Sequence, residues 1–358
     1  MGYTPEIADR TETLRAIDAK QMRIAAGCTP VAIEQTEAWE RFERSQGRPV
    51  WGRYLYEEGN KAVATIALYP YKLGGRRFLW AKHGPTWFRE QSPEREAHLR
   101  KLLLEEVRKR DSSILFVRMH ARYQAPDLHE LANTITYDRT YVIDLTAKTP
   151  EAISDAMPRD GRRGVRRAKR VADEAGCTIA EETGLTRAQF AEVYKVLAET
   201  ARRDGFHPHP LQTYWSFLTA LGPEHARLFV LRKDGVPHAW DIVTTVGKDA
   251  VVPYGASSNE SRKFRAAEAL DWWVACKLAE EGFRGMDLMG ADSARVPELY
   301  TVGQYKRRYA QHPTEVDGAW DVPVRPALYQ ALLTAKKGRD LSRNLKQRVG
   351  KSRQTSQG

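Results

Sequence analysis

The order of expected secondary structure repeats along the chain, and this repetition constrains the fold more than any other feature. Residues 51–80 alternate as three extended runs with glycine-containing turns between them, and a helix beginning at Ser92 and a strand at 114–119 follow. The second series comprises extended runs inside 226–257, a helix over 266–278 and a strand at 285–289. Because the strands come in runs instead of alternating with helices, each series predicts an α+β unit, and the repeat predicts two similar domains.

The segment between the two series supplies the domain boundary. It begins as a strand at 141–145 and becomes an arginine-rich helix. A further helix then opens with a capping box, Thr186 and Gln189, and ends at Gly205. We therefore predict a first domain over 1–145, a second over 146–325, and a C-terminal helix with a basic tail over 326–358.

Composition narrows the class of protein. The 358 residues exceed the roughly 100–200 of one domain, and 42% hydrophobic with 29% charged residues excludes wholesale disorder or a collagen-like chain. No apolar run approaches the roughly 18 residues that cross a bilayer, and acidic residues near the start argue against a signal peptide, so we expect a cytoplasmic protein. Three widely spaced cysteines, Cys28, Cys177 and Cys276, support neither a disulfide framework nor a zinc site.

The distribution of charge suggests a polyanionic partner. The net charge is +11, and the segment from Lys336 to Gly358 holds eight basic residues against one acid. A second basic concentration lies at 159–170. Two such clusters in an otherwise balanced chain favour binding to nucleic acid, nucleotides or anionic lipid, although each run also fits a solvated surface.

Several standard catalytic motifs are absent from the sequence. It lacks the phosphate loop of P-loop nucleotidases, the H-E-x-x-H zinc motif and the G-x-S-x-G elbow of α/β-hydrolases. It also lacks the pyrophosphate loop of acyl-CoA N-acyltransferases. His207 and His209 flank Pro208 and fit a fixed surface loop better than a metal site. We therefore predict no metal and no cofactor.

Six short segments form a further pattern. They are IEQTEAWERF with Gln35 and Trp39, AKHGPTW with His83, YVIDL followed by GRRGVRRAKR, YKVLAETARRDGF with Arg203, PYGASS with Tyr254, and QYKRRYA with Tyr305 and Lys306. In this order they resemble the Fem family of aminoacyl-tRNA-dependent transferases, which attach amino acids to peptidoglycan precursors. The resemblance implies two acetyltransferase-like (GNAT) domains in tandem. The short interval between Gly205 and Ala226 leaves no room for the helical arm that some members carry.

The resemblance also implies roles for individual residues. It assigns catalysis to Lys306, whose charge would lie near the reacting carbonyl or the terminal phosphate of the tRNA. The implied substrate-binding residues are Arg203, Tyr254, Tyr305, Trp39 and His83. From the residues alone, Lys306 also fits an exposed helical lysine, Arg203 a helix-end ion pair with Asp204, and Tyr254 a core aromatic.

The basic segments have matching roles in this hypothesis. Arg162, Arg163, Arg166 and Arg167 recur at helical spacing and would form a ridge that binds tRNA phosphates. The C-terminal tail fits either nonspecific RNA binding or peripheral contact with the anionic inner face of the membrane.

The acceptor is the less certain substrate. Glu43 stands where precursor-binding members commonly have a lysine, and Phe88 and Arg89 stand where an acidic residue is expected. The favoured acceptor is a peptidoglycan precursor, UDP-MurNAc-pentapeptide or lipid II. A small secondary metabolite such as a peptide antibiotic is the alternative acceptor. Two other functions stay open as alternatives: an acyl-CoA-dependent N-acyltransferase and a non-catalytic RNA-binding module. The sequence does not identify the amino acid, its tRNA or the oligomeric state.

Overall fold

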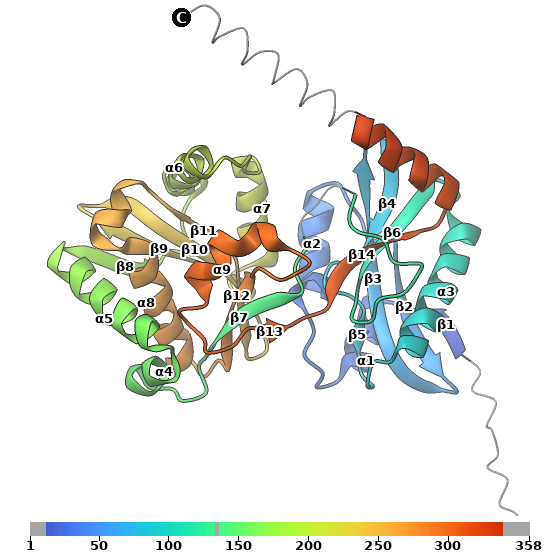
Figure 1. The fold of residues 1–358 in the computed structure, drawn as a ribbon, viewed down its shortest axis with the longest axis horizontal. Helices are drawn as coiled ribbons and strands as arrows, with labels where there is room; N and C mark the ends of the chain where they lie inside the picture. Colours follow the sequence, from blue (N-terminus) through green and yellow to red (C-terminus); the bar gives the residue numbers. More distant parts are fainter. Residues whose placement is uncertain (1–11, 133–135, 339–358) are drawn as a thin grey trace, which may run out of the picture.

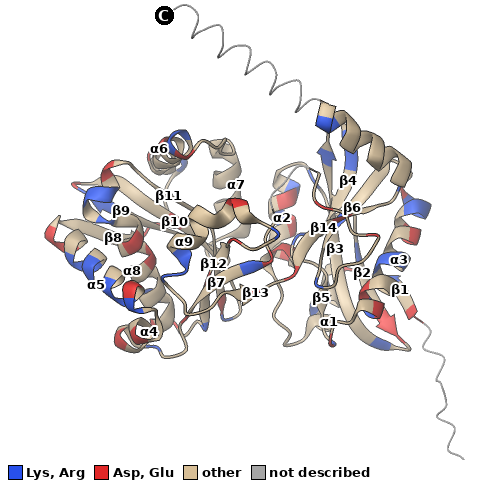
Figure 2. Ribbon diagram, in the orientation of Figure 1, with Lys and Arg blue, Asp and Glu red and all other residues tan. Residues whose placement is uncertain are grey.

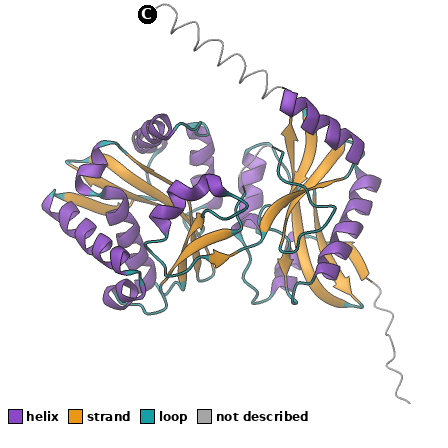
Figure 3. Cartoon of the chain, viewed as in Figure 1, coloured by secondary structure: helices purple, strands orange, loops and turns teal. Residues whose placement is uncertain are grey.

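The chain forms two seven-stranded sheets that lie beside each other, each covered by helices (Figure 1). The computed structural model describes residues 12–132 and 136–338. Strands and helices gather into two separate lobes in Figure 3, as the sequence repeat predicts. No helix within the described residues has the length and apolar character to cross a membrane.

The first sheet has the strand order β1-β2-β3-β4-β6-β14, with β5 paired to β3. Its strands are β1 (Glu12–Ala16), β2 (Gly52–Glu58), β3 (Lys61–Leu73), β4 (Arg76–Trp80), β5 (Thr86–Trp87), β6 (Ile114–Ala121) and β14 (Gly318–Pro323). The helices of this lobe are α1 (Ala19–Ala26), the 3₁₀ helix η1 (Ile33–Gln35), α2 (Glu37–Ser45) and α3 (Pro93–Arg110). The predicted three-stranded meander is therefore β2, β3 and β4. Ser92 caps α3, as predicted, by accepting a hydrogen bond from the Arg95 amide.

The second sheet has the order β13-β7-β12-β11-β10-β9-β8. Its strands are β7 (Arg139–Asp144), β8 (Cys177–Glu181), β9 (Ala226–Lys233), β10 (Val236–Val246), β11 (Asp249–Ser257), β12 (Gly285–Gly290) and β13 (Thr314–Glu315). Its helices are α4 (Pro150–Ala156), α5 (Arg159–Glu174), α6 (Arg187–Asp204), α7 (Leu211–Leu221), η2 (Glu260–Phe264), α8 (Ala266–Glu280), η3 (Pro297–Leu299) and α9 (Tyr300–Lys306). Helices α5 and α8 share one core with this sheet, and α6 and α7 share another.

Strands β11 and β12 are parallel neighbours that pair only over a short stretch. Their register runs from Asp249 opposite Gly285 to Val251 opposite Asp287. Beyond that point the two strands continue to Ser257 and Gly290 without pairing to each other. We refer to the unpaired stretch beyond Val251 and Asp287 as the wedge between the two strands.

The two lobes exchange strands, which differs from the predicted boundaries at 145 and 325. Strand β7, expected in the first domain, pairs with β12 in the second sheet. Strand β14, expected in the second domain, pairs with β6 in the first sheet. Residues 326–338 form the expected C-terminal helix and pack Tyr329 against the first lobe. The remainder of the basic tail lies outside the described residues.

A shared hydrophobic core joins the lobes. Trp39 and Phe42 of α2 contact Phe217 of α7, with ring centroids 5.9 and 5.2 Å apart. The ring of Phe217 also packs against Tyr254 of β11 at 5.3 Å. The lobes are thus held together by buried aromatic side chains, and the cavities between them have defined walls.

Candidate active site

A cavity of about 440 Å³ lies between the two lobes. The first lobe contributes residues around η1, the start of α2 and the ends of β4 and β6, and the second contributes residues of β10, β11, β12 and α7. Its polar and aromatic lining residues are Glu34, Trp39, Trp80, Lys82, His83, His120, Tyr137, Phe217, Thr244, Asp249, Tyr254 and Asp287. Three residues predicted to bind substrate, Trp39, His83 and Tyr254, are among them.

Lys82 lies on the first wall of this cavity inside a group of aromatic rings. Its Nζ is 4.7 Å from the ring centroid of Trp80, 5.1 Å from that of Trp39 and 5.3 Å from that of Tyr71. Burial lowers the pKa of Lys82, and the carboxylate of Glu43 acts in the opposite direction. The chain has Glu43 where members of the family commonly have a lysine, but Lys82 provides a positive charge on this wall.

Two histidines stack beside Lys82. The rings of His83 and His120 are 4.7 Å apart, and the Nδ1 of His120 lies 2.8 Å from the carbonyl oxygen of Asp317. Burial lowers the pKa of His83 to about 4 and that of His120 to about 3, so both imidazoles are neutral at pH 7. His83 adopts a φ of +48°, in the left-handed region, which places its ring toward the cavity wall shared with Glu34, 3.9 Å away.

The opposite wall is built at the wedge between β11 and β12. Asp287 of β12 accepts hydrogen bonds from the Thr140 hydroxyl and, at 2.6 Å, from the Met289 amide. Burial raises the pKa of Asp287 despite these bonds. The ring of Tyr254 on β11 packs against Tyr214 at 4.9 Å, so Tyr254 is part of an aromatic cluster and also lines the cavity.

Lys306 reaches this wall from α9. Its Nζ donates a 2.8 Å hydrogen bond to the carbonyl oxygen of Gly290. Burial lowers the pKa of Lys306 to about 8, and the carboxylates of Asp287 and Asp271 act in the opposite direction. Lys306 is therefore not an ordinary exposed lysine. It is a largely enclosed ammonium group fixed behind the cavity wall.

Tyr137 connects Lys306 with the histidines. Its ring centroid is 6.2 Å from that of His83. A Cβ at Gly290 would lie 2.7 Å from Cδ1 of Tyr137, so the ring packs directly on the backbone that binds Lys306. The predicted catalytic lysine is thus linked to the two histidines through the Gly290 backbone and the Tyr137 ring.

Two of the predicted substrate-binding residues are placed elsewhere. The Tyr305 hydroxyl donates a 2.5 Å hydrogen bond to Asp271 behind the wedge, so Tyr305 does not line the cavity. Arg203 pairs with Asp204 through bonds of 2.8 and 2.9 Å and donates to the carbonyl oxygen of Ser257 at 2.8 Å. This is the helix-end ion pair that the sequence had left open as the alternative for Arg203.

The arginine ridge lies on α5, whose ribbon at the edge of the second lobe carries several blue Lys and Arg positions in Figure 2. Arg163, Arg166 and Arg167 are exposed, whereas Arg162 is half-buried and donates to the Asp155 carbonyl oxygen at 3.1 Å. Near the start of this helix, a Cβ at Gly161 would lie 1.7 Å from the carbonyl oxygen of Arg308. Only glycine allows this approach, which brings the ridge against the backbone two residues beyond Lys306.

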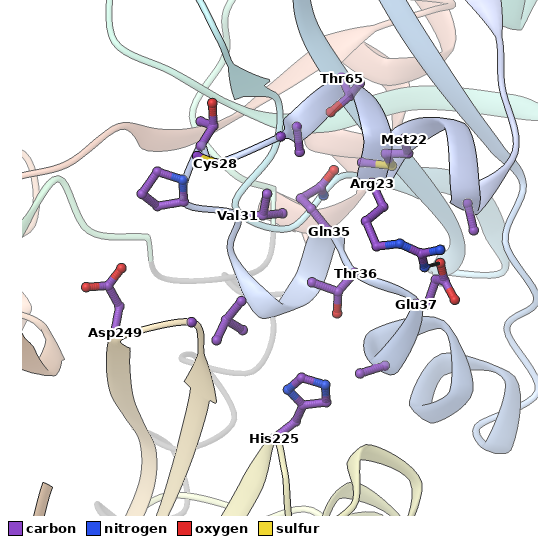
Figure 4. A pocket seen from close by; sticks show the side chains of 18 of the residues that line it. Met22, Arg23, Cys28, Val31, Gln35, Thr36, Glu37, Thr65, His225 and Asp249 are labelled. Carbon is purple, nitrogen blue, oxygen red and sulfur yellow. Dashed lines mark hydrogen bonds and ion pairs between the residues drawn. The ribbon is translucent and has the colours of Figure 1, made fainter. Parts of the chain in front are cut away.

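A second cavity, of about 620 Å³, adjoins the first on the other side of the Pro30–Val31 segment, which lines both. Figure 4 shows Arg23 and Glu37 on its first-lobe side, joined as an ion pair, and His225 and Asp249 on its second-lobe side. The two cavities share the lining residues Pro30, Val31, Val246 and Asp249, and we refer to them together as the cleft between the lobes.

The described residues offer no evident metal site. No group of three or more His, Cys, Asp or Glu side chains within 12–132 and 136–338 is arranged to hold a metal ion. His207 and His209 are both exposed.

Comparison with known proteins defines the class of fold. Residues 159–307, from the first residue of α5 to the residue after α9, match the family model of the acetyltransferase (GNAT) domain. With the repeat in the first lobe, the chain has a tandem acetyltransferase-like fold.

Two solved structures share this architecture. FemX is 14% identical, aligns over 90% of this chain and 100% of its own, and has a TM-score of 0.70. A tandem GNAT protein from the clavulanic acid biosynthesis pathway is 14% identical over 87% of this chain and 98% of its own, with a TM-score of 0.51. The sequence resemblance to the Fem family is thus confirmed at the level of the fold. A search of curated proteins found no match.

Proposed function

We propose that this protein is an aminoacyltransferase that moves an amino acid from aminoacyl-tRNA to the amino group of a peptide-containing acceptor. The observation that carries the proposal is the enclosed ammonium of Lys306, bound to Gly290 at the wall of the interlobe cavity in a fold shared with FemX. A fixed cation at this place is suited to stabilise the negative charge that develops on a reacting carbonyl oxygen.

The chemistry requires no covalent intermediate on the protein. The amine nitrogen attacks the ester carbonyl, the new C–N bond forms, the C–O bond to the tRNA ribose breaks, and the proton lost by the amine ends on the ribose oxygen. None of the residues that line the first cavity is a serine or cysteine. Direct transfer requires that both substrates bind together and be aligned.

The donor side of the proposal rests on α5. Three exposed arginines, Arg163, Arg166 and Arg167, can bind the phosphates of the tRNA acceptor stem. The contact between Gly161 and Arg308 places this helix next to the segment that carries Lys306. A tRNA bound on the ridge would therefore lie on a helix that begins beside the segment carrying Lys306.

On the acceptor side we favour a peptidoglycan precursor, UDP-MurNAc-pentapeptide or lipid II, with a small peptide-like metabolite as the second candidate. The cleft has room beyond the first cavity for a long acceptor. Glu43, however, accepts hydrogen bonds from Arg48 and Tyr71 and is fully enclosed, so this wall differs from a simple cationic acceptor site. That difference favours testing both acceptor classes. We propose a cytoplasmic location, with the basic tail in contact with anionic lipid or RNA.

The deciding experiment is an incubation of the protein with tRNAs charged with labelled amino acids and with three acceptor pools: UDP-MurNAc-pentapeptide, lipid II in detergent, and small peptidyl amines. Mass spectrometry should detect an amide product with one pool. Transfer from acetyl-CoA instead would support an ordinary acyl-CoA N-acyltransferase. Binding of tRNA without any product would support an RNA-binding module and reject the proposed function.

A further inference from the structure

A pair of buried carboxyl groups lies directly behind the proposed site. Asp241 of β10 and Asp271 of α8 are only 6% and 7% exposed, and their side chains are within hydrogen-bonding reach of each other. No hydrogen-bond donor among the described residues reaches the Oδ2 atom of Asp241. Neither residue lines a cavity of the cleft, and neither was singled out by the sequence motifs.

A proton must be shared within this pair. Two carboxylates in contact and out of water cannot both carry a charge, because their mutual repulsion adds to the cost of burial. Burial raises the pKa of both groups, and the neighbouring Asp271 raises that of Asp241 further. Hydrogen bonds from tyrosine hydroxyls act to lower the pKa of Asp271. The proton therefore resides on Asp241, and the negative charge resides on Asp271.

The charge on Asp271 is the anchor of α9. The Tyr305 hydroxyl donates to its Oδ2 at 2.5 Å, and the Tyr309 hydroxyl donates to the same atom at 3.1 Å. These tyrosines flank Lys306, one immediately before it and the other one turn after it. The two bonds therefore fix the end of the helix from which the Lys306 side chain reaches the Gly290 carbonyl.

A glycine on the neighbouring strand makes room for the pair. Gly255 is the cross-strand partner of Asp241. A Cβ at this position would lie 2.5 Å from Oδ1 of Asp241, so any side chain would displace the carboxyl group. The absence of a side chain at Gly255 thus leaves the space that the Asp241 carboxyl group occupies, which argues against a chance burial of the two acids.

We propose that Asp271, with Asp241 as its proton-sharing partner, is the positioning residue for Lys306: through Tyr305 and Tyr309 it fixes the helix end that carries the lysine, and with Asp287 it supplies negative charge that favours the protonated lysine. The catalytic role of Lys306 in this inference rests on the proposed function, whereas the anchoring of Tyr305 and Tyr309 by Asp271 does not. The ionisable groups that face Asp271 or Lys306 from the surrounding elements are Asp241, Glu268, Asp287, Tyr305 and Tyr309. Asp271 and Asp287 are the acidic ones among them that act on Lys306.

The test measures the protonation of Lys306 directly, without any substrate. Wild-type protein and Asp271→Asn are treated with an N-hydroxysuccinimide ester of acetate over a pH series, and modification of Lys306 is quantified by mass spectrometry. Exposed Lys169 serves as the internal reference. Removal of an opposite charge should lower the midpoint for Lys306 by about one pH unit. Glu280→Gln, at the exposed far end of the same helix, is the matched control and should leave the midpoint unchanged.

A second variant separates position from charge. Tyr305→Phe/Tyr309→Phe removes the hydroxyl donors and keeps the carboxylate. We expect kcat for aminoacyl transfer to fall about tenfold or more with KM little changed, while the Lys306 midpoint stays within a few tenths of a unit of wild type. If Asp271→Asn does not fold, this double variant still tests the proposal.

The outcomes are distinguishable from failure of the proposed function. If wild type transfers no amino acid to any acceptor but the midpoint shifts in Asp271→Asn, the proposed function fails and the control of Lys306 by Asp271 stands. A folded Asp271→Asn with an unchanged midpoint, or a double tyrosine variant with wild-type kcat in an active enzyme, would overturn the positioning role.

Discussion

Arg118 and Asp321, 203 residues apart in the chain, form an ion pair with hydrogen bonds of 2.6 and 3.0 Å, and both side chains are fully enclosed. Asp321 belongs to β14, the strand that returns from the second lobe to close the first sheet on β6. It also accepts bonds from the Tyr329 hydroxyl and the Ala132 amide. The charges of Arg118 and Asp321 thus neutralise each other, whereas the acid pair Asp241 and Asp271 of the second lobe needs a shared proton.

Because both side chains are fully enclosed, loss of Asp321 should leave the buried guanidinium of Arg118 without this carboxylate partner. We expect Asp321→Ala to lower the free energy of unfolding by roughly 3–5 kcal/mol, measured by urea denaturation. The matched control is Arg139→Ala, which removes an exposed pair with Glu315 and should cost less than about 1 kcal/mol. A loss at Asp321 no larger than that of the control would show that β14 does not hold the first lobe closed.

The two stacked histidines should make the protein less stable in mild acid. Their pKa values of about 4 and 3 lie below the 6.5 of an ordinary histidine, so the unfolded chain binds more protons than the folded one between these values. The contribution of the neutral histidines to the free energy of unfolding is therefore fully present above about pH 6.5 and is lost as the pH is lowered toward 4. Repulsion by nearby Lys82 lowers the pKa of His83 further, whereas the carboxylate of Glu34 acts to raise the pKa of His120.

Urea midpoints at pH 7.5 and pH 5 measure this loss. His83→Asn should reduce the difference between the two midpoints, because asparagine tolerates a positive φ and carries no titrating ring. His312→Asn, at an exposed position, is the control and should keep the wild-type difference. Equal pH dependence in wild type and His83→Asn would mean that His83 titrates as it does in the unfolded chain.

Lys306→Gln should abolish most of the activity without unfolding the protein. Since the lysine supplies one hydrogen bond to Gly290 and a charge beside the cavity, we expect kcat to fall by roughly 10²–10³ with the circular dichroism spectrum retained. In wild type the rate should decline as the pH rises through about 8, because the ammonium form is lost. Arg307→Gln, the exposed neighbour, is the control, and an unchanged rate in Lys306→Gln would remove this lysine from the mechanism.

The repeated architecture was predictable because its signals are local. Alternation of side chains in β2 to β4, the Ser92 cap of α3 and the capping box of α6 each depend on residues close in sequence. The pairing of β7 with β12 and of β14 with β6 was not predictable, because nothing within a strand specifies a partner more than a hundred residues away. Helix α7 was also missed, since Pro210 offers it no side-chain cap and it contains no charged residue.

Only part of the candidate site was predicted, because only some of its residues lie in local sequence motifs that assign them a role. Lys306, Trp39, His83 and Tyr254 were found through motifs, and the structure places all four at or just behind the wall of one cavity. His120 comes from a strand with no motif, and Lys82 lies inside AKHGPTW but has no role assigned to it there, so only the fold brings the two together. Asp241 and Asp271 did leave a signal, an acidic residue within an apolar strand and within an apolar helix face, and such residues merit attention in similar sequences.

The arginine ridge on α5 yields a prediction about tRNA binding that separates free from neutralised cations. Among the residues that the structure describes, no carboxylate lies within ion-pair distance of Arg163 or Arg167, whereas Lys169 and Arg170 pair with Asp173 and Glu174. If the ridge binds phosphates, Arg163→Ala/Arg167→Ala should weaken tRNA binding and reduce the slope of log K against log salt by about 2. Lys169→Ala/Arg170→Ala, with the same change in charge on the same helix, should reduce the slope by less, because those cations already have partners.

Filter binding at several salt concentrations provides the slopes. Equal slopes for both double variants would indicate that the tRNA responds to the total charge of the protein and has no contact with the ridge.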